Sequence, residues 1–239
     1  MSPALYDSFI ADYYDESPLV RLRMQDVAFY RDAARKRAAL NKEERERVHL
    51  VQADMTQFDL GEKFQLILIP FRPFQHLLEV RDQMACLDCV RKHLRPAGRL
   101  ILDVFQTDAE RIHDTVHMRE SPLVEYRSHD GKLVRISERV AAFHRAEQRN
   151  DVEMIYAVEH PDGQKERLVF AWPLRYFFRY EVEHLLARSG FRVTAEYGDF
   201  DKTSIGDDSP EMIFVAEPSS SSEFTPPVTA RRRTSAKAR

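Results

Sequence analysis

The stretch from Val48 to Pro70 constrains the fold more than any other part of the sequence. It contains two short, largely apolar runs, Val48–Ala53 and Leu66–Ile69, separated by an acidic segment that favours turns. Short apolar runs bounded by turn signals are typical of strands that are covered on both faces, as in a parallel sheet. The stretch therefore predicts two buried strands of an α/β sheet.

Asp54 directly follows the first of these runs. In open α/β sheets, ligands bind in the crevice outside the carboxyl ends of the strands, where a carboxylate accepts hydrogen bonds from N–H or O–H groups. An aspartate also stabilises turns by accepting hydrogen bonds from the backbone that follows it. The sequence leaves both interpretations of Asp54 open.

Composition sets broad limits on the function. The chain has 239 residues, enough for one large α/β domain or two small ones, and a formal net charge of −3. That charge does not indicate nucleic acid or an anionic surface as a partner. No apolar run reaches membrane-spanning length, and the acidic N-terminus lacks the pattern of a signal segment. We therefore expect a cytoplasmic protein that binds neither nucleic acid nor membrane.

Glycine is sparse in this chain. Only seven glycines occur, and no two are separated by a single residue. Glycine-rich loops that hold phosphates or nucleotides contain such closely spaced glycines. The sequence therefore has no nucleotide loop of the usual type.

The remaining elements follow from local patterns. Apolar spacing and helix signals predict helices, and Pro96 and Gly98 are expected to turn the chain. Alternating apolar residues between Pro122 and Phe178, with turns at Asp130-Gly131 and Asp162-Gly163, predict antiparallel strands. In order, the predicted elements are a two-piece helix Leu19–Arg47, helix Arg81–His93, strand Leu100–Phe105, helix Asp108–His117, strands Leu123–Tyr126, Lys132–Phe143, Asp151–His160 and Glu166–Phe178, helix Arg179–Ser189, and strands Phe191–Tyr197 and Glu211–Glu217.

Several of these segments together resemble class I S-adenosylmethionine-dependent methyltransferases of the small-molecule type. The acid after the family's third strand resembles Ala53-Asp54-Met55, and its fourth strand resembles Phe64–Ile69. Its fifth strand, introduced by L-R-P-x-G, is similar to Leu94–Asp103. The resemblance covers about residues 5 to 217 and implies a Rossmann-like α/β sheet with an antiparallel β insertion.

One block of the family pattern is missing from this sequence. The family begins with a strand, a glycine-rich loop, a helix and a second strand ending in an acid; in the family the loop wraps the methionine part of the cofactor. Near Lys36–Arg37 the sequence passes directly between two helix-like pieces. We therefore predict an incomplete sheet lacking its first βαβ block. The domains are predicted as residues 1–217, with the insertion at about 122–178, and a disordered basic tail at 218–239.

The missing block has a structural consequence. The family sheet order is 3-2-1-4-5-7-6, so without strands 1 and 2 the Val48–Val51 segment is expected to pair directly with Leu66–Ile69. The sheet face that the missing helix would have covered is expected to expose apolar side chains. Such a surface favours a homo-oligomer.

The resemblance also implies site residues and S-adenosylmethionine as the cofactor. Asp54 would accept from the adenine amino group and Met55 would pack on the ring. The methionine side of the pocket would be lined by strand-end residues, with an N-terminal tyrosine closing over it. The implied cofactor residues are Asp54, Met55, Ile69, Pro70, Phe71 and Tyr14.

The antiparallel insertion would cover the pocket of a small-molecule acceptor. His76 is a candidate general base, although a histidine at such a junction also acts as a cap. Arg175 and Arg179 could hold a carboxylate, or could pair with nearby glutamates. The acceptor-binding candidates are Tyr6, Trp172, Arg175, Tyr176, Arg179 and Tyr197.

No metal site is predicted. Cys86, Cys89 and His93 lie on one helical stretch, but a single C-x-x-C lacks the second ligand pair of a structural zinc site. His113 and His117 are spaced as on one helix face without a third ligand. We expect buried free cysteines and a solvated pair of histidines.

The sequence thus leads to methyl transfer from S-adenosylmethionine to a small molecule. Losing the glycine loop would remove several hydrogen bonds to the cofactor, each contributing about 1 kcal/mol. The alternatives are a non-catalytic methyltransferase remnant that binds or oligomerises, and an incomplete gene sequence of a working enzyme.

Overall fold

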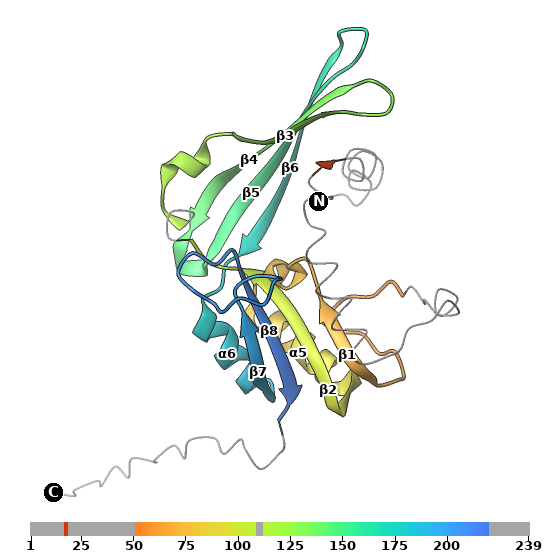
Figure 1. Cartoon of the computed structure of the whole chain (residues 1–239), viewed down its shortest axis with the longest axis vertical. Coiled ribbons are helices and arrows are strands. Elements are labelled where there is room, and N and C mark those ends of the chain that lie inside the picture. Colours follow the sequence, from red (N-terminus) through yellow and green to blue (C-terminus); the bar gives the residue numbers. More distant parts are fainter. Residues whose placement is uncertain (1–16, 19–50, 109–111, 220–239) are drawn as a thin grey trace, which may run out of the picture.

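The structure is a computed structural model that describes residues 17–18, 51–108 and 112–219. These residues form two four-stranded sheets, one α/β and one antiparallel. In Figure 1 the antiparallel sheet stands above one end of the α/β sheet. Within these ranges, no helix is long and apolar enough to cross a membrane.

The α/β sheet contains β1 (Phe64–Ile69), β2 (Leu94–Phe105), β7 (Phe191–Tyr197) and β8 (Glu211–Pro218), in the order β1-β2-β8-β7. β1 and β2 are parallel, whereas β8 is antiparallel to both of its neighbours. The predicted strand at Leu66–Ile69 and the two strands near the end of the domain are confirmed. Because β8 runs against β2, its first residue Glu211 lies opposite Phe105 at the carboxyl end of β2.

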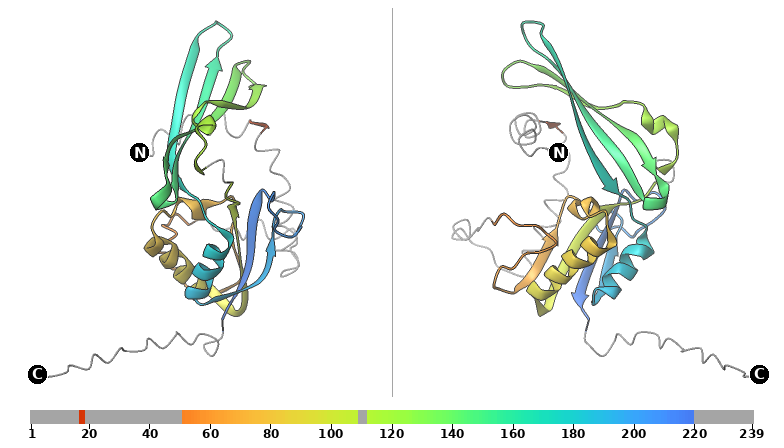
Figure 2. Two further views of the ribbon diagram at one scale, coloured as in Figure 1. Left: turned by 90° about the vertical axis from the view of Figure 1, so that its left-hand side faces the viewer. Right: turned by 180° about the vertical axis from the view of Figure 1, so that it is seen from behind.

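Two helices cover one face of this sheet. α5 (Val80–His93) and α6 (Arg179–Arg188) lie side by side on the same face (Figure 2). α5 buries an apolar stripe, as predicted for Arg81–His93, and packs it on the inner face of the strands. The core between helices and sheet is built from fully buried side chains that include Phe74, Leu87, Leu100, Leu102 and Phe214.

The antiparallel sheet contains β3 (Ser121–Arg127), β4 (Leu133–His144), β5 (Arg149–Glu159) and β6 (Lys165–Arg175) in sequential order. Its turns use Gly131 and Gly163, whose φ angles of 85° and 87° are accessible to glycine at no steric cost. One face is apolar and centred on Val134, Ile136, Tyr156 and Val158. The opposite face carries ion pairs, among them Arg135 with Glu125 and Arg139 with Glu153.

Three local predictions are wrong. Val51–Ala53 is not a strand, because the chain there leads into a turn at Asp54 that packs on α5. The helix predicted over Asp108–His117 lies partly outside the described residues, and its described end contains a 3₁₀ turn, Thr115–Met118, capped by the Asp114 carboxylate. The last strand of the antiparallel sheet ends at Arg175 rather than Phe178.

The pairing expected between Val48–Val51 and Leu66–Ile69 falls mostly outside the described residues. Val51 itself belongs to no strand and is 64% exposed. The expected helix Leu19–Arg47 and the tail beyond Ser219 also lie outside the described residues. Two predicted site residues, Tyr6 and Tyr14, are likewise outside the described residues.

A fourth local prediction, the turn at Pro96 and Gly98, is also wrong, because both residues lie within β2. Between the pairs Phe64–Leu94 and Leu66–Arg99, β1 advances two residues while β2 advances five. The extra residues form a bulge that brings the backbone of Gly98 against its neighbours. A Cβ at this position would lie 2.9 Å from the Phe64 carbonyl oxygen and 3.0 Å from that of Arg95.

Gly98→Ala is therefore expected to destabilise the protein by about 1–3 kcal/mol, because the new methyl group meets backbone atoms that cannot move away easily. Gly206→Ala is the matched control, since a Cβ at Gly206 has no atom within 4 Å. Urea unfolding followed by circular dichroism measures both variants. Equal stabilities of the two variants would contradict the tight packing at the bulge.

Candidate functional site

The backbone adopts an unusual conformation just after the carboxyl end of β1. Ile69 is buried at the last position of the strand, and Pro70 leads into two residues with positive φ. These residues, Phe71 (φ 66°) and Arg72 (φ 62°), are not glycines. Non-glycine residues in this region require support from their surroundings and occur preferentially at functional sites. The Phe71 side chain is 49% exposed, whereas that of Arg72 points into the protein.

A buried ion cluster supplies that support. The Arg72 guanidinium binds both carboxylate oxygens of Glu211, with 3.0 Å between Nε and Oε2. Its Nε also lies 3.9 Å from the Asp103 carboxylate on β2, and its guanidinium carbon lies 3.9 Å from the centroid of the Phe105 ring. All three charged residues are at least nine-tenths buried. The cluster therefore joins the ends of β1 and β2 to the start of β8.

The 3₁₀ turn η3 (Pro73–His76) follows this cluster and carries two polar residues with different surroundings. Gln75 is 1% exposed, and its amide accepts from the backbone N–H of Phe105 (2.9 Å) and donates to the carbonyl of Arg175 (2.7 Å). His76 is exposed at one side and contacts the backbone of Pro173 in β6. Burial lowers the pKa of His76, and the hydrogen bond with the Pro173 backbone partly opposes that shift.

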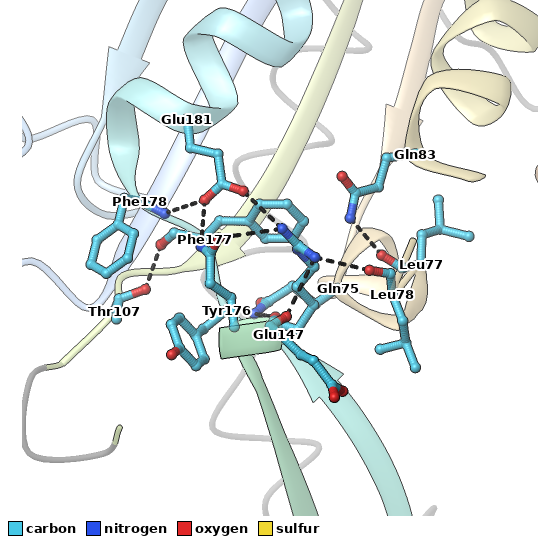
Figure 3. A network of polar contacts seen from close by, with 12 residues as sticks. Gln75, Leu77, Leu78, Gln83, Thr107, Glu147, Tyr176, Phe177, Phe178 and Glu181 are labelled. Atoms are coloured by element: carbon cyan, nitrogen blue, oxygen red, sulfur yellow. Dashed lines mark hydrogen bonds and ion pairs between the residues drawn. The ribbon is translucent and has the colours of Figure 1, made fainter. Parts of the chain in front are cut away.

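Arg175 lies at the joint between the two sheets. Its guanidinium donates to the Leu78 carbonyl (3.0 Å) and pairs with Glu181 of α6 (3.1 Å). Glu181 also accepts from the backbone N–H of Phe178 (3.3 Å) and from the Gln148 side chain (2.8 Å). Figure 3 labels Leu78, which follows η3, and Phe178 and Glu181 at the start of α6, and it shows them around this network of polar contacts. The guanidinium of Arg175 is thus already bound to protein groups.

Arg179 has comparable partners on the outer side of α6. It hydrogen-bonds Glu196 of β7 and lies 3.5 Å from the Glu183 carboxylate. Burial raises the pKa of Glu183, and the adjacent Glu196 contributes to the same shift. Both arginines therefore show the glutamate pairing that the sequence left open. Binding of an acceptor carboxylate by either one stays a prediction.

Asp54 lies in a turn beside α5. Its Oδ1 accepts from the backbone N–H (2.8 Å) and the hydroxyl (2.7 Å) of Thr56, and these bonds lower the pKa of Asp54. Asp54 is close enough to Cys86 to affect that thiol, Cys89 donates to the Thr56 carbonyl, and Leu60 donates to the His93 ring. The segment therefore runs alongside α5 in the same direction, with Asp54 at its end nearer the carboxyl edge of β1. Met55 packs on the core.

Cys86, Cys89 and His93 of α5 all have structural roles. Both cysteines are buried free thiols, as expected, and burial raises the pKa of Cys86 to about 12. His93 donates from Nδ1 to the Cys89 carbonyl (2.7 Å) and accepts at Nε2 from Leu60 (2.9 Å). Among the described residues no group of three or more His, Cys, Asp or Glu side chains could hold a metal ion.

The other acceptor candidates do not form one cluster. Trp172 stacks near Phe170 on β6, with ring centroids 5.0 Å apart. Tyr176 follows β6 and its hydroxyl reaches the Arg145 carbonyl (3.5 Å), while burial raises its pKa. Tyr197 lies on β7 and packs with Ile213 and Val215 on the sheet face opposite the helices.

Sequence reasoning missed the buried polar residues at this edge. Gln75 and Arg72 have no periodic pattern around them, so nothing marked them as buried. Asp103 did carry a signal, because it stands within the apolar run of β2, where an acidic residue requires a partner. Glu211 was placed at the start of a strand, but its partner could not be identified from the sequence.

The described strands match part of a known architecture. The order β1-β2-β8-β7, with β8 antiparallel, corresponds to strands 4-5-7-6 of the methyltransferase sheet. No protein-family model and no curated protein sequence matches the chain, whereas solved structures do. A methyltransferase dependent on S-adenosylmethionine, from Clostridium acetobutylicum ATCC 824, matches with a TM-score of 0.59 and 12% identity, over 75% of this chain and 69% of that one.

Two sugar-modifying enzymes match over similar lengths. CalS10 from Micromonospora echinaspora, an amino pentose methyltransferase solved with bound S-adenosylmethionine, has a TM-score of 0.54 and 22% identity, over 70% of this chain and 63% of that one. The sugar N-methyltransferase KedS8 from Streptoalloteichus sp. ATCC 53650 has a TM-score of 0.54 and 17% identity, over 71% of this chain and 62% of that one. The chain has the fold of S-adenosylmethionine-dependent methyltransferases. It spans less than two thirds of the length of CalS10 and of KedS8.

The methyltransferase fold gives the two sides of β1 different roles. In the family order, strands 1 and 2 lie beyond β1 on the side away from β2, and they carry the cofactor loop. Asp54 and Ile69–Phe71 are the residues predicted to bind the cofactor on that side, and this role stays a prediction. Arg72, Gln75 and His76 lie between that side and the antiparallel sheet.

Removing the Arg72 charge is expected to cost about 3–5 kcal/mol of stability, because Arg72→Met leaves the buried Glu211 carboxylate without its partner. The control is Arg81→Met, since Arg81 pairs with Asp82 at the surface and is 83% exposed, a type of pair that contributes about 0–1 kcal/mol. Chemical unfolding measures both. A second substitution, Glu211→Leu, should restore part of the stability lost in Arg72→Met; a further loss would show that the pair is not the cause.

Proposed function

We propose that this chain binds S-adenosylmethionine at the carboxyl edge of β1 and transfers its methyl group to a small-molecule acceptor held beneath the antiparallel sheet. The observation that carries the proposal is the match of the α/β sheet to methyltransferases. We assign Asp54 and Ile69–Phe71 to the cofactor side of that fold. The match in fold alone does not select the acceptor.

The residues on the cofactor side fit a nucleoside. Asp54 is exposed, and only its Oδ1 is used by hydrogen bonds within the described chain. The lowered pKa keeps the carboxylate ionised at neutral pH, so Oδ2 can accept from an amino or hydroxyl group. Pro70 and the half-exposed Phe71 supply apolar surface at the end of β1. In this proposal Met55, beside Asp54, lines the adenine end, and Tyr14 closes the pocket.

We infer further that the first βαβ block of the family is absent from this chain. Two observations support this inference. The first glycine in the sequence is Gly61, so no glycine-rich loop precedes the Asp54 turn. The chain also spans only part of each structural neighbour. Loss of that block would weaken cofactor binding and leave a surface on which two copies could associate. If the chain shows no binding of S-adenosylmethionine, the alternative function, a non-catalytic methyltransferase remnant, is favoured.

Bound S-adenosylmethionine supplies an activated leaving group, so the protein mainly aligns the acceptor, excludes water and removes a proton. His76 is the candidate for the proton, because its imidazole is neutral at pH 7 and lies between β1 and β6. Trp172 and Tyr176 offer aromatic surface on the same insertion, with Tyr6, Arg175, Arg179 and Tyr197 as further proposed contacts to the acceptor.

The acceptor class to test first is an amine on a sugar. Two structural neighbours are named as enzymes of this kind, an amino pentose methyltransferase and a sugar N-methyltransferase. An alkylamine is largely protonated at neutral pH, and it must lose a proton before its nitrogen lone pair can attack the methyl group. A nearby neutral imidazole can take that proton, so it suits this chemistry. The domain is proposed to comprise residues 1–217, with the insertion at about 122–178 and a tail at 218–239.

Calorimetric titration of the full chain with S-adenosylmethionine is expected to show saturable binding, and Asp54→Asn is expected to weaken it by about tenfold, the equivalent of one charge-assisted hydrogen bond. Asp59→Asn is the matched control, because Asp59 is also exposed and also accepts from the backbone N–H two residues ahead (2.9 Å). Absence of heat with the native chain would overturn the proposed function. Equal weakening by both variants would remove Asp54 from the site.

Methyl transfer is expected to depend on pH through His76. Because the pKa of His76 lies below the ordinary value of about 6.5, the imidazole is deprotonated across neutral pH. Activity should therefore rise with pH in the acidic range and become level near pH 7. His76→Asn should lower kcat by about 10²–10⁴-fold and abolish that rise. A pH profile that is the same in His76→Asn and the native chain would exclude His76 as the base.

A further inference from the structure

The two sheets are joined by an unusual side chain, the buried amide of Gln75. Its oxygen accepts from the backbone N–H of Phe105, the last residue of β2, at 2.9 Å. Its nitrogen donates to the carbonyl of Arg175, the last residue of β6, at 2.7 Å. One amide therefore holds the end of an α/β strand to the end of an antiparallel strand. Gln75 is 1% exposed, so water does not replace either bond easily.

The surrounding contacts make this joint rigid. The Arg175 side chain turns back to the Leu78 carbonyl just after η3, at 3.0 Å. It also pairs with Glu181, which fixes the start of α6 (Figure 3). A backbone bridge between Gln106 and Phe177, and a hydrogen bond from the Thr107 hydroxyl to the Phe177 carbonyl, add two further ties. These contacts connect the end of β6 and the residues that follow it with η3, with the end of β2 and with the start of α6.

His76 sits next to Gln75 in η3, and its environment depends on both sheets. His76 is part of η3, which packs with the α/β sheet. The group that its ring contacts, the Pro173 backbone, lies in β6 of the antiparallel sheet. The distance between these two parts is set where Gln75 binds Arg175, two residues beyond Pro173. A change in that bond would move the β6 end away from His76.

We propose that Gln75 is a positioning residue: its amide sets the antiparallel sheet over the carboxyl edge and so holds His76 in place against β6. The proposal rests on the proposed function for its catalytic meaning, because His76 matters there as the proton acceptor. Its structural content, that Gln75 controls the surroundings of His76, is tested independently of any substrate.

The chain offers a closely matched control in Gln83. This residue is also 1% exposed, and its amide also donates to a backbone carbonyl at 2.7 Å, but the acceptor is Leu77, within the same layer. Gln75→Leu and Gln83→Leu each remove an amide-to-carbonyl hydrogen bond of 2.7 Å. Gln75→Leu also removes the acceptor of the Phe105 N–H, and only Gln75→Leu acts on the antiparallel sheet.

The experiment is an NMR titration of histidine ring signals in the full chain, with the His76 signal assigned by its disappearance in His76→Asn. The native chain and Gln83→Leu are expected to titrate His76 below its ordinary range, and Gln75→Leu is expected to move this titration upward. An unchanged titration in Gln75→Leu, or equal shifts in both leucine variants, would overturn the proposal. If Gln75→Leu does not fold, Gln75→Met replaces it, because methionine keeps the length of the side chain, makes neither amide hydrogen bond and adds no charge beside His76.

Calorimetry with S-adenosylmethionine separates this proposal from the proposed function. Binding to Gln75→Leu should stay within about twofold of the native value, because the two side-chain hydrogen bonds of Gln75 reach Phe105 and Arg175 and not Asp54 or Ile69–Phe71. A native chain that binds no S-adenosylmethionine would overturn the proposed function, and the His76 titration would still decide the role of Gln75. A large loss of binding in Gln75→Leu alone would show that Gln75 supports the cofactor side instead.

Discussion

The buried ion pair between Arg72 and Glu211 fixes the edge on which the candidate site is built. It holds two consecutive residues of positive φ, Phe71 and Arg72, in a backbone conformation that non-glycine residues rarely adopt. With that turn in place, Phe71 faces outward at the end of β1 and the chain enters η3 with Gln75 directed inward. A buried pair is costly to form and contributes little net stability by itself. Its physical effect is to select one path for the backbone after β1, and Gln75 and His76 follow that path.

Much of the α/β layer was predictable because its signals are local. The apolar run Leu66–Ile69, the amphipathic stretch Arg81–His93 and the glycine turns at 131 and 163 each specify an element within a few residues. The bulge at Gly98 was misread as a turn, since a proline and a glycine close together favour a turn in most sequences. Only the register between β1 and β2 shows that the chain continues as a strand there. Register depends on the neighbouring strand, which a local pattern does not contain.

The sequence could indicate single candidate residues of the site, but it could not indicate which residues they contact. Asp54 was singled out as the residue after an apolar run, and its carboxylate accepts from Thr56 in a turn, which is one of its two interpretations. Ligand binding by Asp54 stays a prediction. Arg175 and Arg179 were identified, and their glutamate partners were not, because Glu181 and Glu196 come from elements that meet only in the folded chain. Gln75 could not have been selected at all. Its two partners lie 30 and 100 residues away in the sequence.

The proposed site has two halves, a cofactor side and an acceptor side, and the fold supports them differently. The cofactor side depends on an exposed turn and on the end of β1, an edge strand in the described sheet, so its geometry is sensitive to whatever lies beyond that edge. The acceptor side depends on the joint between Gln75, Arg175 and Glu181, whose bonds are all inside the described structure. Shielded hydrogen bonds of this kind keep their geometry because leaving one unmade costs about 1–3 kcal/mol. A chain that lost part of its cofactor side would thus retain a well-defined acceptor side, and His76 would keep its neutral state with or without the nucleoside.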